Sequence, residues 1–244
     1  MRYMGGKTRL AKPITDTILS LVPNRTLYLE PFVGGGSVFA AMAPRFEWAV
    51  AGDLQHDLIL MWNALLFEGW VPPESVSEDE YLTLRDSEPS PLRGFVGYGV
   101  SWGGRFFEGY ARGANANYAA TSTRSVLKFK DIVHKALKPS QVGRFRNQNY
   151  ADWNPTPGTT IYCDPPYKGT KTYHSARSGL VPFDHEHFWR TMNTWVENGC
   201  YVFVSEYQAP PEWSSVWSLE RKVSMDQVNK REIIAVEHLF TRVI

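Results

Sequence analysis

The strongest chemical signal in the sequence is the tetrapeptide Asp164-Pro165-Pro166-Tyr167. It directly follows residues 159–163, a short apolar run that predicts a buried strand. Because the carboxyl ends of parallel strands border the ligand crevice of an α/β sheet, we expect the tetrapeptide at the rim of a site. A nucleobase amino group is a poor nucleophile, since its lone pair is delocalised into the ring. A carboxylate and a backbone carbonyl that each accept one N–H would make that lone pair available.

Asp164 and the carbonyl of Pro165 are the candidates for these two acceptors, and consecutive prolines stiffen the loop that carries them. Tyr167 offers an aromatic face on which an unstacked base can lie. The alternative interpretation is an ordinary turn followed by a buried tyrosine. Neighbouring strand residues face opposite sides, so Cys163 is predicted to pack in the core rather than to act as a nucleophile.

A second signal is a cluster of three glycines at residues 34–36, between a strand predicted over residues 26–30 and a helix predicted over residues 38–43 with Ser37 as its N-cap. Glycines let the backbone approach a ligand closely, and a helix N-terminus favours a negative group. Asp53 follows Gly34 by nineteen positions, at the end of the next predicted strand, where an acid usually binds ribose hydroxyls. The pattern indicates an adenosine-bearing cofactor, with a plain turn residue as the alternative for Asp53. NAD is disfavoured, because Phe39 stands where its fingerprint needs glycine or alanine.

The N-terminal Gly5-Gly6-Lys7-Thr8 resembles the end of a phosphate-binding P-loop. That loop needs a preceding strand and a glycine where this chain has Met1, so an ATPase is disfavoured. We expect the segment instead to bring the cation of Lys7 over a cofactor carboxylate. A flexible tail is the alternative.

The predicted elements alternate between strand and helix in two stretches of the chain. The first contains residues 26–30, 38–43, 48–51 and 57–67, and the second contains residues 159–163, 184–198 and 201–205, followed by a possible hairpin of residues 219–223 and 232–240. Between them lies a region rich in proline and glycine, with a short basic helix predicted over residues 128–138. The sequence thus predicts an α/β, Rossmann-like catalytic domain of residues 1–65 and 151–244, interrupted by an inserted module of residues 66–150.

Charge is unevenly distributed, although the net charge of the chain is only +1. Residues 92–148 contain ten Lys or Arg against two acidic residues, which favours a polyanionic partner. The alternative is a solvated surface that faces an acidic neighbour. No apolar run reaches about 18 residues and no signal peptide is evident, so we expect no membrane partner and a cytoplasmic location. Two cysteines are too few for a disulfide framework or a cysteine-based zinc site.

In this order, Gly-Gly-Lys, Phe-x-Gly-x-Gly and Asp-Pro-Pro-Tyr resemble the Dam-like (D12 class) DNA adenine N6-methyltransferases. The resemblance implies a Rossmann-like, AdoMet-dependent methyltransferase sheet with an inserted target-recognition domain. It implies direct transfer of a methyl group from S-adenosyl-L-methionine (AdoMet) to a flipped adenine, with S-adenosyl-L-homocysteine as product and no metal. Asp164 would bridge the cofactor and the target amine, and Tyr167 would stack on the adenine. The residues implied to line the AdoMet pocket are Tyr3, Lys7, Phe32, Gly34, Gly36 and Asp53.

The implied partner is double-stranded DNA, and we expect a monomer or weak dimer. Arg105, Arg112 and Arg124 are candidate DNA contacts. Residues 97–112 differ from the Cys-Arg-Tyr-Asn type segment of GATC-methylating members and are similar to phage-borne members, which disfavours a GATC target and suggests a bacteriophage or prophage source. A cytosine-N4 methyltransferase and a non-catalytic DNA-binding relative are the rival interpretations. Asp164 favours adenine, because serine is commoner at this position in the cytosine-N4 group.

Overall fold

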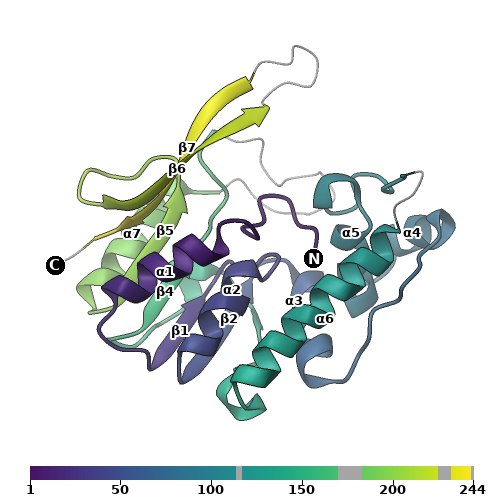
Figure 1. Cartoon of the computed structure of the whole chain (residues 1–244), viewed down its shortest axis with the longest axis horizontal. Helices are drawn as coiled ribbons and strands as arrows, with labels where there is room; N and C mark the ends of the chain where they lie inside the picture. The colour runs from purple at the N-terminus through teal and green to yellow at the C-terminus, as the bar shows by residue number, and fades with distance from the viewer. Residues whose placement is uncertain (114–116, 170–182, 225–231, 243–244) are drawn as a thin grey trace.

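The computed structural model of the chain describes residues 1–113, 117–169, 183–224 and 232–242. Within these residues, one seven-stranded sheet has the order β3-β2-β1-β4-β5-β7-β6 (Figure 1). The parallel strands are β1 (Leu27–Glu30), β2 (Trp48–Asp53), β3 (Arg146–Asn147), β4 (Thr160–Cys163) and β5 (Tyr201–Glu206). The antiparallel edge is the hairpin of β6 (Ser214–Ser224) and β7 (Glu232–Thr241), as expected. The predicted mixed α/β fold with a Rossmann-like sheet is confirmed.

Side chains alternate between the two faces of the sheet, and a separate apolar core lies on each face. Tyr28, Tyr162 and Phe203 belong to the larger core. Their strand neighbours pack in the second core with Cys163, whose thiol lies 3.6 Å from the sulfur of Met192. The predicted packing role of Cys163 is therefore confirmed.

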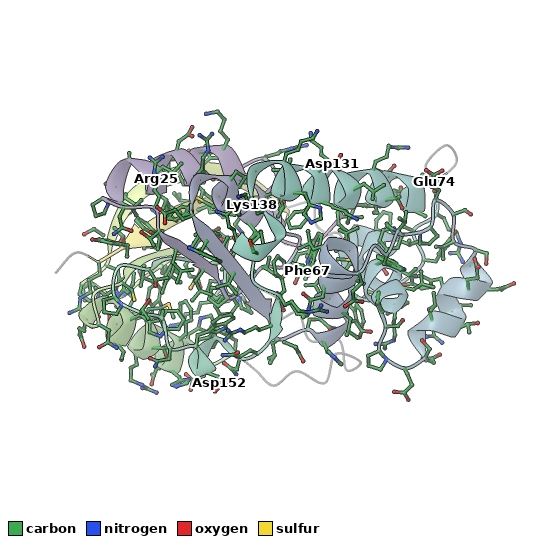
Figure 2. The ribbon with its side chains drawn as sticks, turned by 90° about the horizontal axis from the view of Figure 1, so that it is seen from below. Arg25, Phe67, Glu74, Asp131, Lys138 and Asp152 are labelled. Carbon is green, nitrogen blue, oxygen red and sulfur yellow. The ribbon has the colours of Figure 1, made fainter. Side chains whose placement is uncertain are left out.

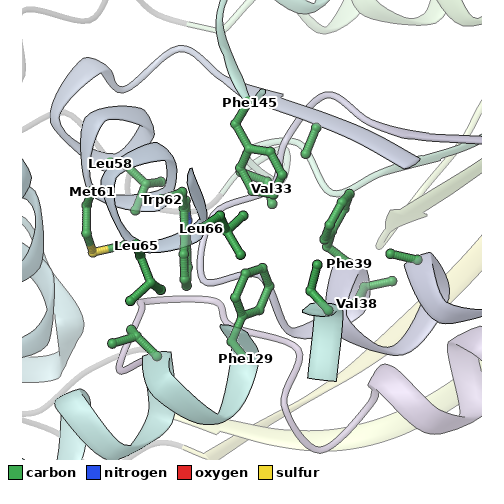
Figure 3. Close-up of a cluster of buried hydrophobic side chains, with 14 of the residues drawn as sticks. Val33, Val38, Phe39, Leu58, Met61, Trp62, Leu65, Leu66, Phe129 and Phe145 are labelled. Carbon is green, nitrogen blue, oxygen red and sulfur yellow. The ribbon is translucent and has the colours of Figure 1, made fainter. Parts of the chain in front are cut away.

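Helices cover both faces. The larger core includes residues of α1 (Ala11–Leu21), α2 (Ser37–Met42), α3 (His56–Phe67) and α6 (Tyr118–Ala136), whereas α7 (His185–Glu197) packs on the second core. Figure 3 shows Phe129 of α6 between α2 and α3, with its ring centroid 4.3 Å from that of Trp62. Because these aromatic rings pack against each other, α6 is fixed to the larger apolar core and does not form a separate layer.

Two helix starts differ from the prediction. Gly36, with a left-handed φ of 73°, takes the N-cap position of α2 that was predicted for Ser37, so that prediction is wrong. The Ser37 hydroxyl instead hydrogen-bonds the Thr8 hydroxyl at 3.0 Å. The basic helix begins at Tyr118, ten residues before the predicted start, because the Asn117 side chain caps it by accepting the Ala120 N–H at 2.9 Å.

The segment of residues 66–150 also contains α4 (Glu78–Arg85) and α5 (Pro91–Gly99). Helix α5 packs on α3, where Arg93 forms a largely buried ion pair with Asp57 at 2.5 Å. The end of this segment joins the sheet as β3, and Asn63 of α3 exchanges two hydrogen bonds of 2.9 Å with the backbone of Phe145. A division of the chain at residues 66 and 150 remains a proposal.

The view from below places Asp131 of α6 at the outer edge of the molecule, with Phe67 of α3 nearer its middle (Figure 2). This orientation matches the burial of the helix, since Asp131 is exposed whereas Phe129 and Val133 are buried. Among the described helices, none combines the length and the apolar character that a membrane crossing requires.

Candidate active site

A cavity of about 270 Å³ opens at the carboxyl ends of β1, β2 and β4, where the strand order reverses. It brings together segments that lie far apart in the sequence. The predicted site residues that line it are Tyr3, Lys7, Phe32, Gly34, Gly36, Asp53, Arg105, Asp164 and Pro166. The predicted residues Pro165, Tyr167, Arg112 and Arg124 are not among the described residues of its lining.

The glycine turn after β1 forms one wall of the cavity, and Tyr3 covers it. Gly34 has a positive φ of 44°, and a Cβ atom there would lie 2.8 Å from the Tyr3 ring. Tyr3 in turn contacts Tyr98 of α5, with 4.8 Å between the ring centroids. Glycine is therefore required at position 34 by both the turn conformation and the close approach of the N-terminal segment.

Asp53 lies at the end of β2 and faces the same cavity. Its two carboxylate oxygens accept the backbone N–H groups of Gly34 and Gln55, each at 3.0 Å. Burial raises the pKa of Asp53, and these backbone hydrogen bonds counteract part of the rise. A carboxylate oxygen has more than one acceptor lone pair, so both oxygens retain the capacity to bind hydroxyl groups from the cavity.

An aromatic wall stands beside Asp53. The ring of Phe32 stacks on Tyr150 with 5.3 Å between centroids, and Phe183 packs edge-on against Phe32 at 6.1 Å. All three residues line the cavity. Tyr150 was not predicted as a site residue, because β3 has only two residues and gives no recognisable strand pattern before it. Phe183 was not predicted either, because it stands before a helix and not directly after a predicted strand. The wall suits a flat, largely apolar ring.

Asp164 forms a buried ion pair with Lys7 at the cavity wall. The Lys7 ammonium lies 2.7 Å from the Asp164 carboxylate and 3.5 Å from Glu237 of β7, and Lys7 is only 7% exposed. Burial raises the pKa of Asp164, while the charge and hydrogen bond of Lys7 lower it. In this structure the cation expected over a cofactor carboxylate therefore pairs with the carboxylates of the protein.

Tyr167 lies behind this ion pair. Its hydroxyl donates to Glu237 at 3.0 Å, the Lys7 ammonium lies 4.8 Å from its ring centroid, and its ring meets Tyr207 nearly perpendicularly at 4.8 Å. Burial, followed by the nearby Asp164 and Glu237 carboxylates, raises the pKa of Tyr167. The predicted stacking of Tyr167 on a target base remains a proposal. The part played by Glu237 was missed, since it depends on the approach of β7 to the loop after β4.

The positive charge of residues 92–148, the basic segment, is partly neutralised by acidic side chains within the fold. Arg93 pairs with Asp57, Arg112 with Glu78 and Arg144 with Glu68, so acidic neighbours outside the segment account for some of its charge. Arg105 stands at the cavity wall, about half exposed, and pairs with Glu108 at 3.2 Å. Arg124 lies exposed on α6, where it donates to the Thr121 hydroxyl at 3.3 Å.

The crevice of this Rossmann-like sheet combines a glycine turn with an acid after the second strand, at the carboxyl ends of the strands where α/β proteins bind their ligands. Residues 3–87 match the family model described as D12 class N6 adenine-specific DNA methyltransferase, and this match confirms the resemblance that the motifs indicate. A DNA adenine methylase of Vibrio cholerae serotype O1 is 27% identical over an alignment of 192 residues, and the alignment covers 70% of this chain. The aligned part of that relative is 66% of its own length.

A type II methyltransferase of Methanocaldococcus jannaschii, M.MjaIII, is 26% identical over an alignment of 94 residues, which covers 36% of this chain and 32% of that protein. Among solved structures, an rRNA methylase from Streptococcus thermophilus aligns with a TM-score of 0.40 and 7% identity, covering 96% of each chain.

Proposed function

We propose that this chain is a site-specific DNA methyltransferase that transfers a methyl group from AdoMet to the exocyclic N6 of adenine. The observation that carries the proposal is the position of Asp164, which lines the same cavity as the glycine turn and Asp53. The acceptor for a base amine thus stands beside the groups that suit an adenosine-bearing methyl donor. The family match and the Vibrio relative support the same activity.

The residues of the cavity fit AdoMet. Asp53 has acceptor capacity for ribose hydroxyls, and the aromatic wall of Phe32 and Tyr150 offers a face for the adenine. The glycine turn allows close approach of the backbone, and Tyr3, which covers this turn, lines the cavity together with Lys7. When bound, AdoMet supplies an electrophilic methyl group on a sulfonium, and it leaves as S-adenosyl-L-homocysteine.

Asp164 acts in this proposal as a hydrogen-bond acceptor that orients the adenine amine, with the Pro165 carbonyl as the second acceptor. Lys7 favours the ionised carboxylate, because a cation at 2.7 Å opposes the effect of burial on its pKa. Rate enhancement then comes from alignment of the amine in the cavity and needs no covalent enzyme intermediate. Within the described part of the chain, no group of three or more His, Cys, Asp or Glu side chains is placed to hold a metal ion.

Digestion of treated double-stranded DNA to nucleosides, followed by mass analysis, tests the proposal against its rivals. We expect N6-methyl-2′-deoxyadenosine as the methylated deoxynucleoside when purified protein and AdoMet are supplied. N4-methyl-2′-deoxycytidine would instead establish the cytosine-N4 alternative. DNA retention without any methylated nucleoside would establish a non-catalytic DNA-binding relative.

Salt dependence tests the proposed role of the basic segment in DNA binding. If Arg105, Arg112 and Arg124 each neutralise one phosphate, raising salt from about 50 to about 200 mM should weaken binding by roughly 40-fold through counterion release. Fluorescence anisotropy with a labelled duplex measures this slope. The Arg124→Ala variant should reduce the slope by about 0.9, whereas Arg25→Ala, a change outside residues 92–148, should leave it unchanged. A flat salt response of the unmodified protein would contradict the phosphate contacts.

The remaining parts of the proposal follow from this activity. The enzyme acts as a monomer or weak dimer in the cytoplasm of a bacterium or a phage-infected cell. The recognition sequence is read by the inserted segment, with residues 97–112 as the part that distinguishes it from GATC-methylating relatives.

A further inference from the structure

Glu206, the last residue of β5, holds the far end of the loop that carries Asp164. One of its carboxylate oxygens accepts the backbone N–H of Lys168 at 2.7 Å, and the other accepts the backbone N–H of Tyr207 at 2.5 Å. The residue is 1% exposed and does not belong to the described lining of the cavity. Glu206 therefore contacts the loop and not the ligand space.

The sheet explains why this residue reaches the loop. Strands β4 and β5 are adjacent, with Cys163 opposite Val204, so the residues that follow them emerge side by side. The loop is then held at its start by Lys7 on Asp164, at Tyr167 by Glu237, and at its end by Glu206 on Lys168. The two prolines within the loop restrict its conformation further, because their φ angles are fixed.

The ionised state of Glu206 is required for this arrangement. A carboxylate accepts hydrogen bonds at both oxygens, whereas a protonated acid or an amide has a donor group on one side that opposes one of the two N–H groups. The titratable or charged groups near the carboxylate are His185, with Nδ1 at 3.9 Å, together with Asp164 and Lys7. Burial raises the pKa of Glu206 to about 7, although the two backbone hydrogen bonds oppose the rise.

We propose that Glu206 is a positioning residue for methyl transfer, whose ionised carboxylate holds the Asp-Pro-Pro-Tyr loop so that Asp164 faces the target amine. This inference rests on the proposed methyltransferase function. It makes the rate of methyl transfer depend on a group that touches neither the methyl donor nor the base.

The test compares kcat and the KM for AdoMet of the wild type and three variants between about pH 6 and about pH 8.5. At the upper pH, Glu206→Gln should lower kcat by about 10- to 100-fold with little change in KM, since a misplaced Asp164 impairs alignment rather than binding. The ratio of wild-type to Glu206→Gln kcat should fall towards one as the pH decreases, because the wild-type carboxyl becomes neutral as well. Glu206→Asp should not restore the rate, since it keeps the charge but is one methylene too short. Glu186→Gln, an exposed change at the start of α7, is the matched control and should behave as wild type.

Three results would overturn the inference. A ratio of wild-type to Glu206→Gln kcat that stays constant over the pH range would indicate a merely structural role for Glu206. Full activity of Glu206→Asp would indicate that methyl transfer needs a negative charge at position 206 but not the two hydrogen bonds to the loop. A wild-type kcat that is flat over the same range would contradict the required ionisation even if Glu206→Gln failed to fold, which thermal unfolding would reveal. Absence of methyl transfer by the wild type at every pH would instead contradict the proposed function itself.

Discussion

Replacing Asp164 with alanine is expected to lower kcat for DNA methylation by about 10²- to 10³-fold or more, because the variant loses the prearranged acceptor for the target amine. Binding of duplex DNA should be largely retained, since the change leaves the three proposed phosphate contacts, Arg105, Arg112 and Arg124, in place. Single-turnover transfer of labelled methyl groups measures the rate, and fluorescence anisotropy measures retention of the duplex. The same variant leaves Lys7 beside Glu237 alone, so its thermal unfolding has to be recorded as well.

Two further variants show whether the loss is specific. Asp164→Asn keeps the shape and one carbonyl acceptor but removes the charge paired with Lys7, so its rate should lie between those of alanine and wild type. Asp152→Ala removes an exposed carboxylate outside the cavity lining and should leave kcat unchanged. If Asp164→Ala methylated DNA as fast as wild type, Asp164 would have no part in the reaction.

Replacing Gly94 with alanine should destabilise the protein by about 3 kcal/mol, which corresponds to a fall in Tm of roughly 6–12 °C for a chain of this size. A Cβ atom at this position would lie 2.1 Å from the carbonyl oxygen of Asp57 and 2.7 Å from its carbonyl carbon. Both atoms belong to the backbone of α3, which cannot rotate away as a side chain would. Helices α3 and α5 would have to separate, and the Arg93–Asp57 ion pair between them would be weakened.

Gly69→Ala is the control for this effect. A Cβ atom at position 69 would meet no atom of the described residues within 4 Å, so the left-handed φ of 72° is what opposes the change, at a cost of about 1–2 kcal/mol. Thermal unfolding monitored by circular dichroism compares the two variants with wild type. A Tm for Gly94→Ala that is no lower than that of Gly69→Ala would be incompatible with the close packing of α5 on α3.

The catalytic half of the fold was predictable from sequence because its strands and helices have clear hydrophobic periods and turn residues between them. Helix α5 was not, since it contains three glycines, which disfavour a helix by about 1 kcal/mol each. Its stability depends on contact with α3, and one of those glycines, Gly94, makes that contact possible. Strand β3 was also missed. Two residues are too few to show the hydrophobic alternation of a strand, and β3 exists only because it pairs with β2 in the folded chain.

The residues of the candidate site also fall into those that the sequence predicts and those that only the structure reveals. Asp53, Asp164 and the glycine turn were predictable as cavity residues, because each follows directly from the end of a strand in a parallel sheet. The pairing of Lys7 with Asp164 was not, since it depends on how a segment without regular structure folds back over the sheet. Glu206 gave no signal either, because an acid at the end of a strand does not reveal which backbone groups it will accept from.

The N-terminal segment has one side on the cavity and the other on the inserted segment. The Met4 backbone N–H donates to the carbonyl of Gly104 at 3.0 Å, and Tyr3 lies between the glycine turn and Tyr98. A chimera that received only residues 66–150 from a relative would therefore place foreign side chains against Tyr3 and Met4. Under the proposed role of residues 66–150 in target recognition, residues 1–7 would have to be transferred together with them, so the proposed recognition region is discontinuous in sequence although its parts are in contact in space.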